Sequence, residues 1–153
     1  MKKTTQKLSI ALLVFSIAFT ANAQTKRNLK QEEANKKLVT TFYQKLFGDK
    51  DYSVIDKYMT PGYIQHNPSL ADGSEALKNA VQVWLKDTPK GKVDIQHVAA
   101  DGDLVFLHVK TYGQTGKITA ITEIFKVKNI KIVEHWDVIQ EVPAKSENAH
   151  PMF

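Results

Sequence analysis

Apolar positions in the first half of the chain recur at the spacing of helices. From Leu29 to Phe47 they fall three or four residues apart, at positions 38, 39, 42, 43, 46 and 47, and a glycine follows that can end the helix. A second, short helix is predicted from about Ser53 to Met59. The third begins near Asp72 or Ser74, where Glu75 stands three residues after Asp72, at the spacing of a capping box. The pattern therefore predicts three helices before residue 91.

The period of the apolar positions changes to two after Gly91. Four strand-like runs follow, joined by short turns: residues 92–99, 104–112, 117–127 and 131–142. Such short connections indicate antiparallel neighbours. We therefore predict an α+β fold in which three N-terminal helices pack on one face of a strongly curved, mostly antiparallel sheet. The pocket of such a fold lies between the two layers.

Residues 1–23 have the pattern of a signal peptide, and we predict one domain over 24–142 and a polar tail over 143–153. The segment carries three lysines and no acidic residue, continues in an apolar run from Leu8 to Phe19, and ends in Ala21-Asn22-Ala23, which signal peptidase can cleave. The apolar run is shorter than the roughly 20 residues that a membrane span needs. We expect a cleaved, periplasmic or extracellular product with no membrane segment left; an uncleaved anchor is the alternative.

Charge and cysteine content narrow the function classes. The chain has 21 Lys and Arg residues against 16 Asp and Glu, and three of the lysines fall in residues 1–23, which leaves 18 against 16 in the rest. This near balance, with acidic and basic residues interleaved, argues against a nucleic-acid partner. The chain has no cysteine, so packing alone must stabilise the domain in an oxidising compartment.

Two stretches resemble the SnoaL-like family of the NTF2-like superfamily. The first is Tyr63-Ile64-Gln65-His66-Asn67-Pro68 followed by Asp72-Gly73, and the second joins Glu123-Ile124-Phe125-Lys126-Val127 to Lys131-Ile132-Val133-Glu134-His135-Trp136-Asp137-Val138. The order of the elements agrees from about residue 30 to 142. The resemblance implies a conical α+β barrel, a homodimer, and a pocket for a small apolar or carbonyl-containing molecule. We expect no cofactor.

The resemblance also implies a catalytic group. Polyketide cyclases of this family close a ring by an intramolecular aldol reaction, with a pocket aspartate as acid and base, and that position corresponds to Asp137. The second polar position of the pocket falls at Glu123, where most relatives carry Asp, so one extra methylene moves the carboxylate. Ile130 stands where the last hairpin normally has glycine, and a β-branched residue is strained in the left-handed conformation.

Strand parity groups the candidate residues on one face. If residues 128–130 form a three-residue loop, Glu123 lies directly opposite His135, and Asp137 follows on the same face. A two-residue loop would pair Glu123 with Trp136 and split the set. We expect the first arrangement, because an acid–imidazole–acid row is costly to bury without a purpose. Glu123 would then hold the imidazole in one tautomer, or the two residues form only a structural pair.

The candidate catalytic residues are therefore Asp137, His66, Glu123 and His135. Asp137 would take a proton from a carbon acid, and His66 would donate to the enolate oxygen or, alternatively, cap the turn before Pro68. The residues assigned to ligand binding are Tyr63, Asn67, Phe125, His108 and Trp84. His108 also fits a core position, because it shares a predicted strand face with apolar residues.

Two functions of different classes fit these patterns. The first is an enzyme that does acid–base chemistry on a small carbonyl compound, of the aldol, cyclase or isomerase type. The alternative is a non-catalytic protein of the cell envelope that binds a small ligand. A metal site is not expected, because no two histidines have the close spacing of common local ligand pairs.

Overall fold

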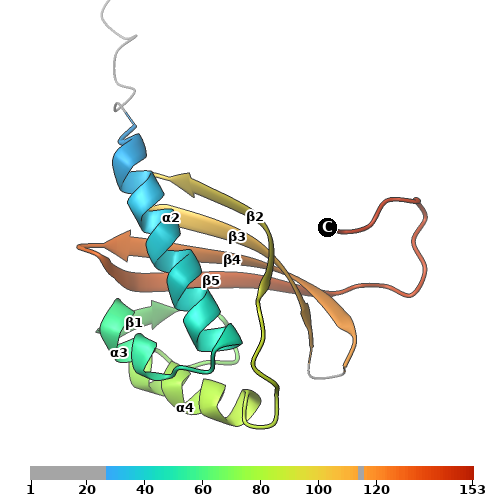
Figure 1. The fold of residues 1–153 in the computed structure, drawn as a ribbon, viewed down its shortest axis with the longest axis horizontal. Helices are drawn as coiled ribbons and strands as arrows, with labels where there is room; N and C mark the ends of the chain where they lie inside the picture. Colours follow the sequence, from blue (N-terminus) through green and yellow to red (C-terminus); the bar gives the residue numbers. More distant parts are fainter. Residues whose placement is uncertain (1–26, 114–115) are drawn as a thin grey trace, which may run out of the picture.

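The computed structural model describes residues 27–113 and 116–153 (Figure 1). The predicted signal peptide lies outside the described residues. The elements in chain order are α2 (Leu29–Tyr43), the π-helix η1 (Gln44–Gly48), α3 (Ser53–Tyr58), β1 (Met59–Gln65), α4 (Ser74–Trp84), β2 (Asp94–Asp101), β3 (Leu104–Tyr112), β4 (Ile118–Lys128) and β5 (Lys131–Glu141). Within the described ranges, no helix has the length and apolar character that a membrane span requires.

The strands form one sheet in the order β1-β5-β4-β3-β2. The last four strands are the predicted antiparallel meander, and β1 pairs in parallel with β5. In Figure 1, α2 lies across one face of the curved sheet, while α3 and α4 gather with β1 beside the β5 edge. The predicted α+β class, with three helices and a mostly antiparallel sheet, is confirmed.

The core lies between α2 and the sheet face that α2 covers, which we call the inner face. Phe42 and Val39 of α2 are buried against it, as the helical spacing of the apolar positions requires. Phe42 packs edge-on against Phe125 of β4, with 6.1 Å between ring centroids. The inner face consists of residues 105, 107 and 109 of β3, residues 121, 123, 125 and 127 of β4, and residues 132, 135, 137 and 139 of β5. The opposite side is the outer face.

The first helix changes from an α-helix to a π-helix before its predicted end. The α-helix stops at Tyr43, and the chain continues to Gly48 as a π-helix. Gly48 packs against the segment before β2, where its carbonyl accepts from the Gly91 N–H at 3.1 Å. A Cβ at position 48 would lie 2.5 Å from the Gly91 carbonyl oxygen, so this close approach requires glycine.

The turn between β4 and β5 differs from the predicted three-residue loop. Lys128 pairs with Lys131, so Asn129 and Ile130 alone form the turn. Both have positive φ, 51° and 60°, which is the backbone of a type I′ hairpin. The three-residue loop is therefore wrong, whereas the left-handed conformation expected at Ile130 is confirmed.

A bulge next to this turn restores the predicted grouping of side chains. The register shifts between Lys126 and Val127, so one extra residue of β5 is accommodated. Glu123 consequently lies opposite Asp137, and Phe125 lies opposite His135. The predicted pairing of Glu123 with His135 is wrong, because the partner of Glu123 lies two residues further along β5. The predicted sharing of the face is right, because a shift by two residues preserves side-chain parity.

Candidate functional site

A hydrogen-bonded cluster lies on the inner face beneath the C-terminal end of α2. Glu123 of β4 and His135 of β5 are both buried, and Nε2 of His135 lies 2.6 Å from Oε2 of Glu123. Tyr43, the last residue of α2, donates its hydroxyl to Oε1 of the same carboxylate at 3.0 Å. Phe125 covers the imidazole, with 4.7 Å between ring centroids. The pair is thus enclosed by one helix and two strands.

The end of β1 supplies the other side of the cluster. Oε1 of Gln65 lies 2.9 Å from Nδ1 of His135, and Nε2 of Gln65 donates to the Tyr63 hydroxyl at 2.9 Å. The backbone N–H of Asn67 donates to the same Oε1 at 2.9 Å. Asp72 accepts from the backbone N–H of Gln65 at 2.7 Å rather than capping α4, whose N-cap is Gly73 without a side-chain bond. The predicted capping box is therefore wrong, and Asp72 anchors the strand end.

Asp137 is half-buried at the edge of the cluster. Nδ2 of Asn67 donates to its Oδ2 at 2.6 Å. Burial raises the pKa of Tyr43 and of Tyr63 well above the usual range of a phenol, and the nearby carboxylates of Glu123 and Asp137 raise it further. Both phenols are therefore neutral at physiological pH and can act as hydrogen-bond donors.

Three residues of the cluster could also offer ligands to a metal ion. One ligand atom each from Glu123, His135 and Asp137 lies within 4.8 Å of the others. Nε2 of His135 and Oε2 of Glu123 are only 2.6 Å apart. Two ligands of a tetrahedral zinc ion, each about 2.0–2.1 Å from it, stand about 3.3 Å apart. The observed spacing is that of a short hydrogen bond, so an ion would have to open this bond.

The structure does not bring every predicted residue to the cluster. His66 lies on the outer face, where its ring stacks on Trp136 at 4.6 Å and Nε2 lies 2.9 Å from Glu134. His108 pairs with Thr122 and also faces outward, stacked on Phe153 at 5.6 Å between centroids. Strand parity explains both placements, because each is one residue away from an inward-facing position. Trp84 ends α4 and is exposed.

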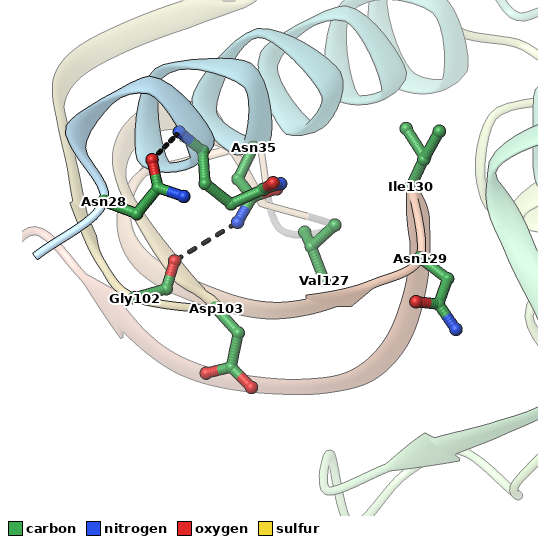
Figure 2. A pocket seen from close by; sticks show the side chains of 8 residues that line it. Asn28, Asn35, Gly102, Asp103, Val127, Asn129 and Ile130 are labelled. Atoms are coloured by element: carbon green, nitrogen blue, oxygen red, sulfur yellow. Dashed lines mark hydrogen bonds between the residues drawn. The ribbon is translucent and has the colours of Figure 1, made fainter. Parts of the chain in front are cut away.

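A hollow of about 340 Å³ lies at the far end of α2 from the cluster (Figure 2). Its lining comes from the start of α2, the β2–β3 turn and the β4–β5 turn: Asn28, Gln31, Asn35, Gly102, Asp103, Val127, Asn129 and Ile130. Hydrogen bonds join some of these lining residues; Asn35 Nδ2 donates to the Gly102 carbonyl at 3.2 Å. This hollow is not the pocket that the sequence predicts beside Asp137.

Sequence reasoning missed two members of the cluster, Tyr43 and Gln65. Gln65 stands two residues after Tyr63 in an extended segment, so the period of two could have placed both on one face. Tyr43 belongs to the apolar stripe of the first helix, where nothing in the sequence distinguishes its hydroxyl from the other core rings. Only its position at the end of α2 brings it over Glu123.

Known structures share this architecture. A SnoaL-like polyketide cyclase of Jannaschia sp. CCS1 superposes with a TM-score of 0.59 at 19% identity, covering 76% of this chain and 90% of that chain. TsrD of Streptomyces laurentii gives 0.57 at 17% identity, covering 70% and 88%. An LEH-like epoxide hydrolase of M. tuberculosis gives 0.58 at 14% identity, covering 72% and 85%. At these identities the likeness shows the fold alone.

The family is identified from the sequence itself. No curated protein matches the chain. The family model described as SnoaL-like polyketide cyclase matches residues 37–147, which include all of the inner-face cluster. The chain therefore belongs to the SnoaL-like polyketide cyclase family.

Proposed function

We propose that the chain is an enzyme that moves a proton on a small, uncharged carbonyl compound bound at the inner-face cluster. Membership of a cyclase family and the fold shared with an epoxide hydrolase support catalysis on a small molecule. The observation that carries the proposal is that Asp137 and Tyr63 each keep hydrogen-bonding capacity that no described neighbour uses. Among the described residues, Asp137 accepts only from Asn67 through Oδ2, and Tyr63 accepts from Gln65 while its own proton remains free to donate.

These two groups can perform complementary steps. The C–H bond beside the carbonyl breaks, its proton passes to Asp137, and the electron pair moves onto the carbonyl oxygen. Tyr63 stabilises that oxygen by a hydrogen bond as the enolate forms. Return of the proton at another carbon gives an isomerase, and attack of the enolate on a second carbonyl gives an aldol closure.

The charge of the site favours an uncharged ligand. The carboxylates of Glu123, Asp137 and Asp72 all raise the pKa of Tyr63. No Lys or Arg within residues 27–113 and 116–153 forms an ion pair with Asp137. A carboxylate or phosphate ligand would therefore meet unbalanced negative charge, whereas a ketone would not.

A non-catalytic binding protein of the cell envelope is the second candidate. In the described part of the chain, every buried side-chain nitrogen and oxygen has a hydrogen-bond partner, and such a satisfied lining also suits a passive ligand site. We propose export for either function, supported by the signal-peptide pattern of residues 1–23. We also propose a homodimer that covers the outer face, supported by the exposed Val138 and Ile64 on that face.

Solvent deuterium exchange at the α-carbon of a panel of small ketones tests the enzyme proposal. Wild type should accelerate exchange of at least one ketone, and Asp137→Asn should lose about 10²–10⁴-fold of that rate. Tyr63→Phe should lose less, because water can replace part of an oxyanion donor. The matched control is Asp87→Asn, at an exposed aspartate after α4, which should leave the rate unchanged. Equal exchange by wild type and Asp137→Asn would remove Asp137 as the base, and no exchange by either would favour the binding protein.

A further inference from the structure

The side-chain amide of Asn67 has only one orientation that fits its neighbours. The backbone N–H of Ser69 lies 2.8 Å from one end of that amide, and a backbone N–H can only donate. The atom facing it must therefore be the oxygen, Oδ1. The other end, Nδ2, then faces Asp137 and donates to its Oδ2 at 2.6 Å. The direction of this hydrogen bond thus follows from a neighbouring backbone group.

The turn after β1 holds Asn67 in place. Its backbone N–H donates to Oε1 of Gln65 at 2.9 Å, and its carbonyl accepts from the N–H of Leu70 at 3.1 Å. The bond from the Ser69 N–H to Oδ1 closes an Asx turn over the same segment. Both backbone groups and the side-chain oxygen of Asn67 are therefore engaged in the turn, and Nδ2 is the group that reaches Asp137.

Asp137, by contrast, is held through one oxygen only. Among the described residues, Asn67 donates to Oδ2, and no other group donates to either carboxylate oxygen. The terminal torsion of an aspartate is broad, so a single well-placed donor narrows the orientation of the carboxylate. Oδ2 stays with Asn67, which leaves Oδ1 as the oxygen that can accept a proton. A base must lie within hydrogen-bond reach of the proton that it takes, so this orientation matters for its rate.

We propose that Asn67 is a positioning residue that holds Asp137 through Oδ2 and so makes Oδ1 the atom that takes the proton of the substrate. The amide is neutral, so it orients the carboxylate without forming an ion pair with it. The sequence assigned Asn67 to ligand binding, whereas in this role it acts on the ligand through Asp137. The assignment of Oδ1 as the proton acceptor rests on the proposed function; the hydrogen bond from Asn67 to Asp137 does not.

The hydrogen bond is tested first, by NMR on ¹⁵N-labelled full-length protein without ligand. One of the two Nδ2 protons of Asn67 should be shifted downfield and should exchange with solvent more slowly than those of Asn148. Asn148 is the internal comparison, because its Oδ1 also accepts from the N–H two residues later, of His150, at 2.9 Å. Asp137→Ala should abolish the difference. Asn67 protons that behave like those of Asn148, or that do not change in Asp137→Ala, would overturn the proposal.

A second measurement separates positioning from a structural or ligand-binding role. Serine can also accept from the N–H two residues later, so Asn67→Ser keeps the turn while its shorter side chain no longer reaches Asp137. In the ketone exchange assay this variant should lower kcat by about 10–10²-fold and leave KM within about twofold of wild type. Asn148→Ser is the matched control and should leave both unchanged. An unchanged kcat in Asn67→Ser, or a raised KM without a lowered kcat, would contradict the positioning role.

The two proposals fail in different ways. Exchange that requires Asp137 but not Asn67 would leave the proposed function standing and remove the role of Asn67. An absence of exchange in wild type would overturn the proposed function, and with it the assignment of Oδ1. The NMR measurement needs neither ligand nor turnover, so it decides in either case whether Asn67 holds Asp137.

Discussion

Each face of the sheet carries a histidine beside a glutamate, and the two pairs differ in their surroundings. On the inner face, the side chains of His135 and Glu123 are 9% and 8% exposed and lie 2.6 Å apart. On the outer face, His66 and Glu134 are 41% and 19% exposed and lie 2.9 Å apart. The residue types are the same, so the type of residue alone does not distinguish the two pairs. Burial distinguishes them, because a buried charge needs every partner that the structure supplies.

The partners of the two glutamates show what this difference means. Glu123 accepts from Tyr43 and faces His135, and its side chain is only 8% exposed, so water has little access to replace either partner. Glu134 has two partners, His66 on one carboxylate oxygen and Lys126, at 3.5 Å, on the other. Water can take the place of both. The inner pair is therefore buried and held by its partners, whereas the outer pair is a surface ion pair of the kind that contributes little to stability.

Removing each carboxylate in turn gives the largest expected contrast. Glu123→Ala leaves the Tyr43 hydroxyl and the buried Nε2 of His135 without their partner, and should lower the free energy of unfolding by about 3–5 kcal/mol. Glu134→Ala should lower it by less than about 1 kcal/mol. Urea denaturation of both variants measures the two losses. Losses of equal size would mean that the two pairs are energetically equivalent, which would contradict the distinction between the buried and the exposed pair.

The outer face should differ from the inner face in a second way, by pairing with another copy of the chain. Val138 on the outer face and Val83 on α4 are 67% and 75% exposed. Sedimentation of residues 24–153 at micromolar concentration should show a dimer. Val138→Lys should weaken it at least tenfold, because the dimer would bury an unpaired charge, while Val83→Lys should not. A wild-type monomer would contradict the homodimer.

The β4–β5 turn sets the register that sorts side chains between the faces, and it contains a strained residue. Ile130 has a φ of 60° and is 77% exposed. Ile130→Gly should therefore raise the free energy of unfolding by roughly 1 kcal/mol, since relief of strain exceeds the added entropy of the unfolded chain. Thermal unfolding measures the change. A loss of stability would show that the Ile130 side chain makes contacts worth more than its strain.

The smallest effect concerns the pH dependence of the outer pair. The hydrogen bond from His66, followed by Lys126, holds the pKa of Glu134 below its usual range. A lowered pKa in the folded state gives stability that is present above the unfolded value, about 4.3, and is lost as the pH falls through the folded value. Glu134→Gln should therefore be slightly less stable than wild type at pH 6 and equal to it near pH 3, as measured by urea denaturation. A difference that grows toward low pH would reverse the sign and contradict this.

The sequence predicted the layers of the fold well, because helical and strand periods depend on local burial. Strand parity also placed Glu123, His135 and Asp137 together, although the turn type behind that reasoning was wrong. The bulge in β5 opposite Lys126 and Val127, which corrected the register, has no sequence signature. His66 was assigned to the pocket because it follows Tyr63 in the same motif, although the alternation that turns Gln65 inward turns His66 outward.

The proposed function requires the inner face, and not the outer one, to bind a small neutral carbonyl compound. The most direct measurement is a titration of ¹⁵N-labelled protein with cyclohexanone at millimolar concentration, followed through backbone amide shifts. We predict that the shifted amides cluster at Tyr63, Gln65, Asn67 and Asp137, and that Asp137→Asn reduces the response. Shifts confined to the outer face around His66 and Trp136, or shifts at the hollow near Ile130, would contradict the account.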